Sequence, residues 1–287
     1  MTVATSGRQA EQTEVMTYRD AVKRALHDEM REDERVLLLG EDVGRAGGVF
    51  KTSAGLIDEF GPGRVIDTPI SETGFVGAAF GMAITGLRPV VEIMFSDFLG
   101  VCYDQIANSM AKYRYMSGGR HEVPVVIRCI GGGGLQFGGQ HSQTGESWFR
   151  VFPGLKIVAA SSPGDAYGML RAAIRDPNPV LFIEHKALYG NKGEVVTGRA
   201  DGALERAAVV RPGRDVTVVA SLAMVPASLK AAELLAEEGV DVEVIDVRSL
   251  RPLDAETVIE SVRRTNRLVT VEEQPVLGGW GSDVVAA

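Results

Sequence analysis

The sequence predicts an α/β fold with two doubly wound, mainly parallel-sheet domains, and three observations carry this prediction. Short apolar runs alternate with segments of helical length along almost the whole chain, as strands and helices do in βαβ units. The 287 residues suit about two domains. Residues 187–214, which are rich in glycine and charge, separate a long first unit from a short second one.

The first unit covers residues 16–186 and opens with a helix. Thr17 followed by Asp20 is a typical helix start, and the apolar residues after it recur on one face. The strands that follow are continuous apolar runs, which is typical of parallel strands buried on both faces. We expect these strands at residues 36–40, 63–70, 88–95, 123–130, 155–162 and 179–186, with helices at 71–86, 97–119 and 162–175.

The second unit covers residues 215–287 and repeats the same alternation over a shorter length. Its strands are expected at residues 216–221, 240–247 and 267–273, and its helices at 224–239 and 254–265. The chain then stops in what resembles a starting helix, so we expect this domain to be truncated. Residues 187–214 show no sustained period and are interpreted as a linker. Residues 1–15 are interpreted as a disordered lead without the apolar core of a signal peptide.

Composition limits the classes of partner. The net charge is -8 and no lysine- or arginine-rich run occurs, so nothing favours binding to nucleic acid or to an anionic membrane. No apolar run reaches the length of a membrane span. Cys102 and Cys129 lie in apolar surroundings, which favours buried free thiols in a reducing compartment over a disulfide. The expected location is the cytoplasm.

A glycine-rich stretch, GGGGLQFGGQHSQTGESWF (131–149), places His141 in a loop with little side-chain cover. It lacks the Gly-Lys-Ser/Thr ending of a phosphate-binding loop, and it does not fit the G-x-G-x-x-G dinucleotide pattern. The other histidines are not at the spacing of a zinc site, and no G-x-S-x-G elbow supplies the nucleophile of a catalytic triad. From these residues alone, His141 either serves a reaction or caps backbone groups of its own loop.

Glu72 lies in the first turn of an expected helix that is otherwise small and apolar. One interpretation is electrostatic, because acids near a helix N-terminus stabilise it by about 0.3–1 kcal/mol. The other interpretation starts from the glycines and alanines of this helix, which let a ligand or another backbone come close. Burial would then raise the pKa of the carboxyl while the helix dipole lowers it, so the group could share a proton near neutral pH.

Several blocks of the sequence resemble one family, in order and from about residue 16 to the end. These blocks include LLLGEDV, RVIDTPISETGFVGAAFGMAITGLRPVVEIMFSDF, QHSQT and VIDVRSLRPLD. The family is the beta subunit of the thiamine-diphosphate-dependent component of 2-oxo acid dehydrogenases, including the pyruvate, branched-chain 2-oxo acid and acetoin enzymes, within the transketolase-like superfamily. The resemblance implies a pyrimidine-binding domain at 16–186 and a transketolase C-terminal-like domain at 215–287.

The resemblance also implies roles for single residues. Glu72 matches the glutamate that hydrogen-bonds the aminopyrimidine ring of thiamine diphosphate and favours its imino form. Phe98 matches an aromatic residue that packs on this ring, although it could equally be plain core. Glu41 matches an acid near the cofactor, although it could equally be a turn residue at a strand end. His141 matches a histidine that faces the reacting centre, hydrogen-bonds the substrate and donates a proton during acyl transfer to lipoamide.

A further match concerns a potassium ion. Val125, the carbonyl groups of Ala173 and Ile174, Asp176 and Asn178 match a structural potassium site of some relatives. An Asp-Pro-Asn turn offers hard oxygen ligands, but it is also an ordinary turn at the end of a helix.

Half of the family's active site is absent from this sequence. Relatives hold the diphosphate through a metal with a Gly-Asp-Gly motif, and this chain has none. The resemblance therefore implies an alpha subunit that brings the diphosphate site and Mg²⁺, in an alpha2beta2 heterotetramer. Family members also usually extend beyond Ala287.

The predicted function is that of a beta subunit in an enzyme that decarboxylates a 2-oxo acid oxidatively, or cleaves acetoin, and passes the acyl group to the lipoyl domain of a dihydrolipoyl acyltransferase. A carboligase subunit of the transketolase kind is one alternative. A scaffold subunit that has kept only the fold is another.

Overall fold

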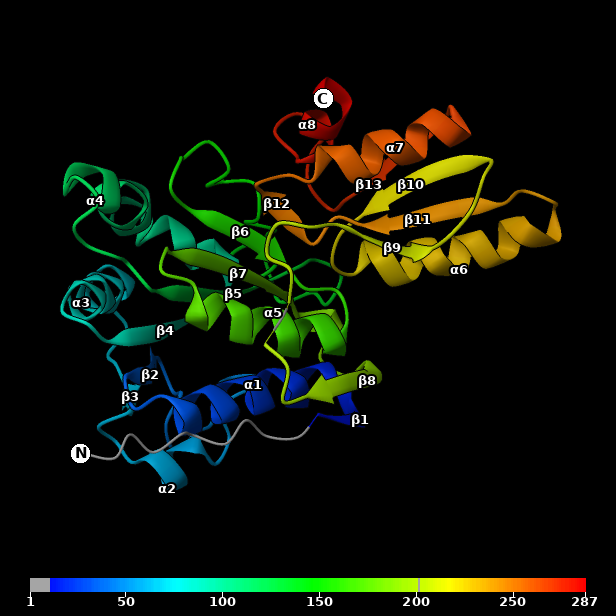
Figure 1. Cartoon of the computed structure of the whole chain (residues 1–287). Helices are drawn as coiled ribbons and strands as arrows, with labels where there is room; N and C mark the ends of the chain where they lie inside the picture. The colour runs from blue at the N-terminus through cyan, green and yellow to red at the C-terminus, as the bar shows by residue number, and fades with distance from the viewer. Residues whose placement is uncertain (1–10, 201) are drawn as a thin grey trace.

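The computed structural model describes residues 11–200 and 202–287, and its largest feature is a seven-stranded sheet (Figure 1). The strands are β2 (Val36–Gly40), β3 (Val65–Asp67), β4 (Arg88–Ile93), β5 (Val126–Gly131), β6 (Lys156–Ala159), β7 (Val180–His185) and β12 (Ser249–Arg251). Their order is β12-β6-β7-β5-β4-β2-β3, and only the edge strand β12 runs antiparallel to its neighbour.

A second sheet of four strands follows the same plan. It contains β9 (Ala208–Arg211), β10 (Val216–Ala220), β11 (Val242–Asp246) and β13 (Leu268–Val271). The order is β13-β10-β11-β9, with β9 as the antiparallel edge. The helices α6 (Met224–Glu237) and α7 (Ala255–Thr265) lie on opposite faces of this sheet (Figure 1). The predicted class of two mainly parallel, doubly wound sheets is confirmed.

Helices cover both faces of the first sheet because neighbouring residues of its strands point to opposite sides. Val90 and Val126 pack in the core beneath α1 (Tyr18–Glu32) and α5 (Pro163–Arg175). Val91 and Ile127 pack in the opposite core, beneath α3 (Glu72–Ile84). The predicted helix starts are confirmed, since the hydroxyl oxygens of Thr17 and Ser162 accept the N–H groups of Asp20 and Asp165. A short helix, α2 (Leu56–Phe60), precedes β3.

The long helix predicted at 97–119 is wrong in its continuity. The segment consists of a 3-10 turn (Ser96–Gly100), a π-helical stretch (Gln105–Met110) and the α-helix α4 (Ala111–Met116). Gly100, a weak helix former, ends the first piece.

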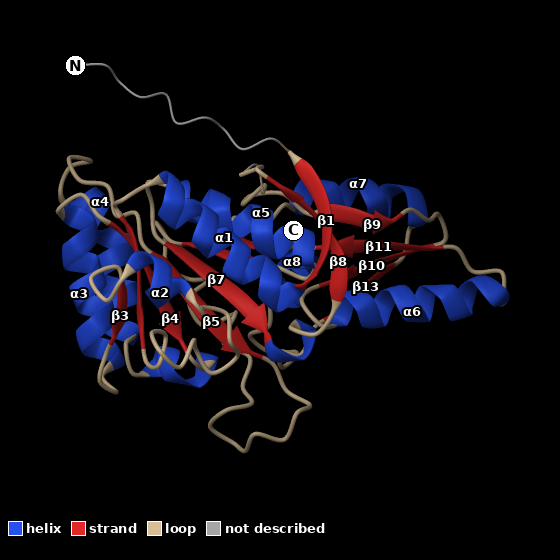
Figure 2. Cartoon of the chain, turned by 90° about the horizontal axis from the view of Figure 1, so that it is seen from below, coloured by secondary structure: helices blue, strands red, loops and turns tan. Residues whose placement is uncertain are grey.

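Two predicted boundaries also need correction. β1 (Gln12–Thr17) pairs antiparallel with β8 (Lys192–Thr197), so part of the expected disordered lead is a strand, and residues 1–10 lie outside the described residues. β8 and β9 both fall inside the segment predicted as an unstructured linker. Figure 2 shows the β1–β8 ribbon beside the helical layer of α1 and α5. Its two strands are about 180 residues apart, and local composition therefore did not reveal the pairing.

The two domains share one apolar core. Trp280, which is fully buried just before α8 (Gly281–Ala286), belongs to the same cluster as Phe75 and Ile127 of the first domain. β12 crosses from the second domain to pair with β6. Among the described helices, none has the length and apolar character needed to cross a bilayer.

Candidate active site at the carboxyl edge of the first sheet

The residues singled out in the sequence gather where neighbouring parallel strands end. Glu41 directly follows β2, Glu72 begins the helix after β3, Phe98 follows β4 and His141 lies in the loop after β5. These four strands are adjacent in the sheet. Since the carboxyl ends of parallel strands meet at one edge, the fold brings all four residues to the same side, where open α/β sheets bind ligands.

Glu41 and Glu72 form a desolvated acidic pair at the mouth of α3. Their exposed fractions are only 8% and 6%. Burial, and then the nearby charge of Glu72, raises the pKa of Glu41, which a hydrogen bond from the Ser71 backbone partly offsets. The Oε1 atom of Glu41 is buried without a hydrogen-bond partner among the described residues. A buried acceptor of this kind is costly unless a donor arrives, so the pair is suited to a ligand that brings N–H or O–H groups.

The small residues of α3 do not all serve the same purpose. A methyl group at Gly77 would lie 3.2 Å from Oε1 of Gln105, so glycine there permits close packing within the chain. A methyl group at Gly81 would meet no atom within 4 Å, and Gly74 and Ala78 are exposed. The outer face of α3 is therefore open in the isolated chain.

His141 lies in an aromatic corner at the same edge. Its ring centroid is 4.5 Å from that of Phe95 and 5.4 Å from that of Phe98, in edge-to-face geometry. Nζ of Lys186 donates a 2.6 Å hydrogen bond to the carbonyl oxygen of His141. Phe98 also packs against the first-domain core, as the core interpretation expects, and its role at the cofactor stays a prediction.

A short segment links the aromatic corner to the acidic pair. The Cys102 thiol lies 3.7 Å from the carbonyl oxygen of Phe98. Burial, with a contribution from the charge of Glu72, raises the pKa of Cys102 to about 12, so this thiol stays protonated. The Thr73 hydroxyl donates a 2.6 Å bond to the carbonyl of Val101. The four predicted site residues therefore border one continuous region.

The residues matched to a potassium site lie in the last turn of α5, in the turn after it and directly before β5, and their oxygens already have protein donors. The Ile174 carbonyl accepts from the Arg88 guanidinium at 2.8 Å, and the Asp176 carboxylate accepts from Lys156 at 2.6 Å. The side-chain oxygen of Asn178 accepts from Arg114, and the carbonyls of Val125 and Ala173 accept backbone N–H groups. Cationic side chains occupy positions beside these oxygens. The potassium site stays a prediction, since each of these oxygens keeps a further lone pair beside its protein donor.

Several important residues of this edge were missed by the sequence reasoning. His185 and Lys186 come directly at the end of β7, so the rule used for Glu41 would have found them. Glu273 comes from the second domain and binds His185 at 2.7 Å, which no local pattern indicates. Below the edge, the fully buried Arg128 joins Glu92 and Glu184 on the neighbouring strands β4 and β7. Within residues 11–200 and 202–287, no three His, Cys, Asp or Glu side chains gather as a metal site.

Comparison with known proteins matches both domains. Residues 14–192 match the transketolase pyrimidine binding domain, and residues 205–287 match the transketolase C-terminal domain. The mitochondrial pyruvate dehydrogenase E1 component subunit beta-2 of Oryza sativa subsp. japonica is 47% identical over 94% of this chain and 73% of its own length. The beta subunit of the acetoin:2,6-dichlorophenolindophenol oxidoreductase of Cupriavidus necator is 48% identical over 93% of this chain and 81% of its own length.

A solved structure titled as a split gene transketolase, inactive beta4 tetramer, has the same fold. It is similar with a TM-score of 0.79 and 27% identity, over 94% of this chain and 84% of that one. The fold, both domain matches and the identity levels agree. The chain belongs to the transketolase-like family that contains the E1 beta subunits of pyruvate and acetoin dehydrogenases.

Proposed function

We propose that the chain is the beta subunit of a heterotetrameric thiamine-diphosphate enzyme. In this proposal the enzyme decarboxylates a 2-oxo acid oxidatively, or cleaves acetoin, and transfers the acyl group to lipoamide. The observation that carries the proposal is the buried pair of Glu41 and Glu72 at the same sheet edge as His141. Membership of the family supports the reaction class.

The residues present fit the aminopyrimidine end of thiamine diphosphate. Glu72 would hold the ring edge, Glu41 would support it with the buried oxygen that now lacks a donor, and Phe98 would pack on the ring. When bound, the cofactor supplies the carbon nucleophile of the reaction. Because its pKa is raised, Glu41 holds a proton more readily than a fully solvated carboxyl would.

His141 is proposed to act on the substrate. Its imidazole is half-buried against Phe95 and Phe98, at the open side of the glycine-rich loop. From there it can hydrogen-bond a carboxylate or carbonyl of the substrate and move a proton during acyl transfer.

The second half of the site is proposed to come from an alpha subunit. The sequence has no Gly-Asp-Gly motif, so the diphosphate and its Mg²⁺ would bind to that partner, in an alpha2beta2 heterotetramer. The acyl acceptor would be the lipoyl domain of a dihydrolipoyl acyltransferase. For the compartment we propose the cytoplasm, because Cys102 and Cys129 are buried free thiols, as reducing conditions maintain them. The plant relatives, by contrast, are named as mitochondrial.

The rival function is carboligation of the transketolase kind. The similarity to a split gene transketolase favours it specifically, because in that protein too the function is divided between chains. The decisive experiment is to co-express the chain with the alpha subunit and to test pyruvate, branched-chain 2-oxo acids and acetoin with an artificial electron acceptor. Activity on one of these substrates supports the proposal. Transfer between a ketose and an aldose without any such activity supports the rival, and inactivity in both assays supports a scaffold role.

A further inference from the structure

We infer that Glu273, supplied by the second domain, is a positioning residue for His141, because it anchors the glycine-rich loop that carries this histidine. The inference rests on the proposed function of His141. The loop leaves β5 at Gly131, which pairs with His185 at the end of β7. The start of the loop therefore lies where the ends of β5 and β7 contact the second domain.

The first step of the loop passes directly over the ring of His185. Gly132 has a φ of +99°, and a Cβ atom there would lie 2.0 Å from Nε2 of His185. Only glycine combines this backbone conformation with such a close approach. The ring is almost completely buried, and the position of the loop start therefore depends on the position of His185.

Hydrogen bonds fix the orientation of His185. Its Nδ1 atom accepts the backbone N–H of Ala187 at 3.1 Å, so the proton of the neutral ring is on Nε2. Nε2 then donates to Oε2 of Glu273 at 2.7 Å. The carboxylate thus holds the ring over which the loop passes.

Glu273 also acts on the loop itself. The hydrogen bond from His185 lowers the pKa of Glu273, and the backbone N–H of Gly133 and the charge of Lys186 lower it further. Lys186 in turn donates to the carbonyl oxygen of His141. The Glu273 carboxylate therefore lies against the start of the loop, and its charge acts on Lys186, the cation that holds His141.

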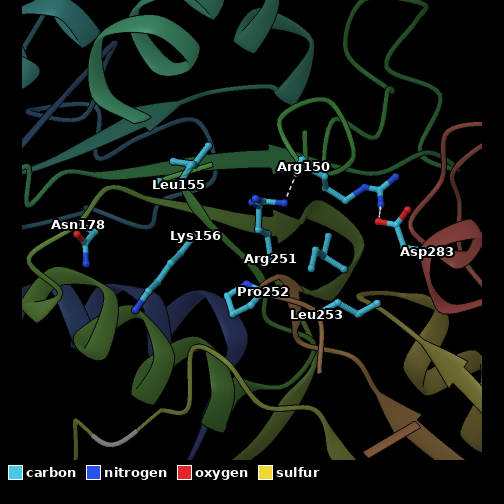
Figure 3. A pocket seen from close by; sticks show the side chains of 10 residues that line it. Arg150, Leu155, Lys156, Asn178, Arg251, Pro252, Leu253 and Asp283 are labelled. Atoms are coloured by element: carbon cyan, nitrogen blue, oxygen red, sulfur yellow. Dashed lines mark hydrogen bonds and ion pairs between the residues drawn. The ribbon is translucent and has the colours of Figure 1, made fainter. Parts of the chain in front are cut away.

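The second domain also holds the remainder of this stretch. Nε2 of Gln274 donates to the Thr144 carbonyl at 2.6 Å. The Arg150 guanidinium donates to the carbonyls of Gly278 and Gly279 at 3.0 and 3.1 Å. It also pairs with Asp283, and Arg251 donates to the Arg150 carbonyl at 2.7 Å (Figure 3). The loop is thus tied to the second domain at both ends.

The middle of the loop has little packing of its own. Leu135 and Phe137 are 47% and 48% exposed. A methyl group at Gly134, Gly138 or Gly139 would meet no atom within 4 Å. Apart from the contacts of His141 with Phe95, Phe98 and Lys186, the position of the loop therefore depends on the ties at its ends. Small displacements of a reacting group are costly, up to about 100-fold in rate for about 1 Å.

The test uses Glu273→Gln in the complete heterotetramer, with Glu272→Gln as the matched control. Glu272 undergoes the same chemical change one residue away, but it accepts from Gly281 of α8 and not from the loop. We expect Glu273→Gln to slow acyl transfer to lipoamide about tenfold. The control should change it less than about twofold, and Glu273→Gln should lower the activity with an artificial electron acceptor less than it lowers transfer.

A double-mutant cycle separates positioning from a general structural effect. If Glu273 acts through His141, Glu273→Gln should slow transfer less than about twofold in a His141→Ala background. Independently of activity, hydrogen exchange of residues 132–145 should be faster in Glu273→Gln than in Glu272→Gln. Should Glu273→Gln reduce the folded fraction, Gln274→Ala provides the second variant, with the same acceleration of exchange expected in the loop.

Three results would overturn the inference: unchanged transfer, the same tenfold loss in both backgrounds, or unchanged exchange of the loop. A wild-type heterotetramer that fails with every 2-oxo acid and with acetoin would instead remove the proposed function. The exchange measurement would still decide whether Glu273 holds the loop, so the two failures are distinguishable.

Discussion

The two halves of the candidate site are placed by different means. Glu72 belongs to α3, whose inner side chains, Phe75, Val76 and Ala79, are buried in the first-domain core. His141 belongs to a glycine-rich loop whose middle is exposed and whose ends are tied to the second domain. A helix holds its first residue through packing close by in the chain, whereas a loop of this composition needs distant support. We therefore expect substitutions at Glu72 to change the chemical step directly, whereas substitutions around the loop should act by displacing His141.

The largest expected effect is at the helix-borne carboxylate. Glu72→Gln keeps the shape of the side chain but removes its ability to share a proton, and turnover should fall about 1,000-fold, within the range of general acid–base catalysis. Turnover is measured with an artificial electron acceptor, and folding is checked by the thermal midpoint. Near-normal turnover in a folded protein would mean that Glu72 has no catalytic role, and the contrast between a helix-borne and a loop-borne catalytic residue would then fail.

The loop-borne residue should have a smaller and more selective effect. His141→Ala should slow acyl transfer to lipoamide about 100-fold. Turnover with an artificial acceptor should decrease less, because that assay omits the transfer to the dithiolane. The ratio of the two rates is the measurement. Equal losses in both assays would place His141 in the earlier steps, and no loss would leave it as a residue of the loop alone.

Glu146, a buried acid at the end of the glycine-rich stretch 131–149, should make the stability of the protein depend on pH. Burial, together with Glu273 and Glu272, raises the pKa of Glu146 to about 7. Because the pKa is higher in the folded chain than in the unfolded one, the associated stability is present at low pH and is lost as the pH rises from about 4.5 through about 7. Glu146→Gln removes this loss.

We therefore expect Glu146→Gln to be more stable than the wild type by about 3 kcal/mol at pH 8 and by about 1 kcal/mol at pH 5. Chemical denaturation at the two pH values measures the difference. A gap of the same size at both values would show that Glu146 does not titrate in this range.

The smallest effect concerns a helix start far from the loop. The hydroxyl of Ser162 caps α5, and Ser162→Ala should lower the free energy of unfolding by about 1 kcal/mol. Acyl transfer should remain unchanged, because neither Ser162 nor α5 contributes a residue to the site. Denaturation curves and the lipoamide assay, run on the same preparation, provide the check. A loss of transfer would mean that the first domain also positions the loop.

Local patterns made part of the molecule predictable. The starts of α1 at Thr17 and of α5 at Ser162 depend on side-chain hydrogen bonds over three residues, and both are confirmed. The parallel strands follow from continuous apolar runs, and Glu41, Glu72 and Phe98 then fall at one edge because they directly follow such strands. The placement was foreseeable, whereas the roles of these residues in catalysis remain predictions.

Other features depend on partners distant in the sequence. The β1–β8 pairing, the crossing of β12 into the first sheet and the contact of Glu273 with His185 each join segments about 90 to 190 residues apart. The break in the expected helix at 97–119 also follows from where the 95–102 segment packs. The donors at the predicted potassium site have the same origin, since Arg88 and Lys156 reach its oxygens from other elements.

By itself, the sequence determined the α/β class, most of the order of strands and helices, and the caps, because hydrophobic periodicity and capping are properties of a few consecutive residues. The family followed separately, from the resemblance of whole sequence blocks. Only the tertiary structure decided which strands pair, which charges meet in the interior and what holds the loop of His141. Those contacts depend on the approach of distant segments, and their free energy is set by the burial and geometry reached when the two domains pack together.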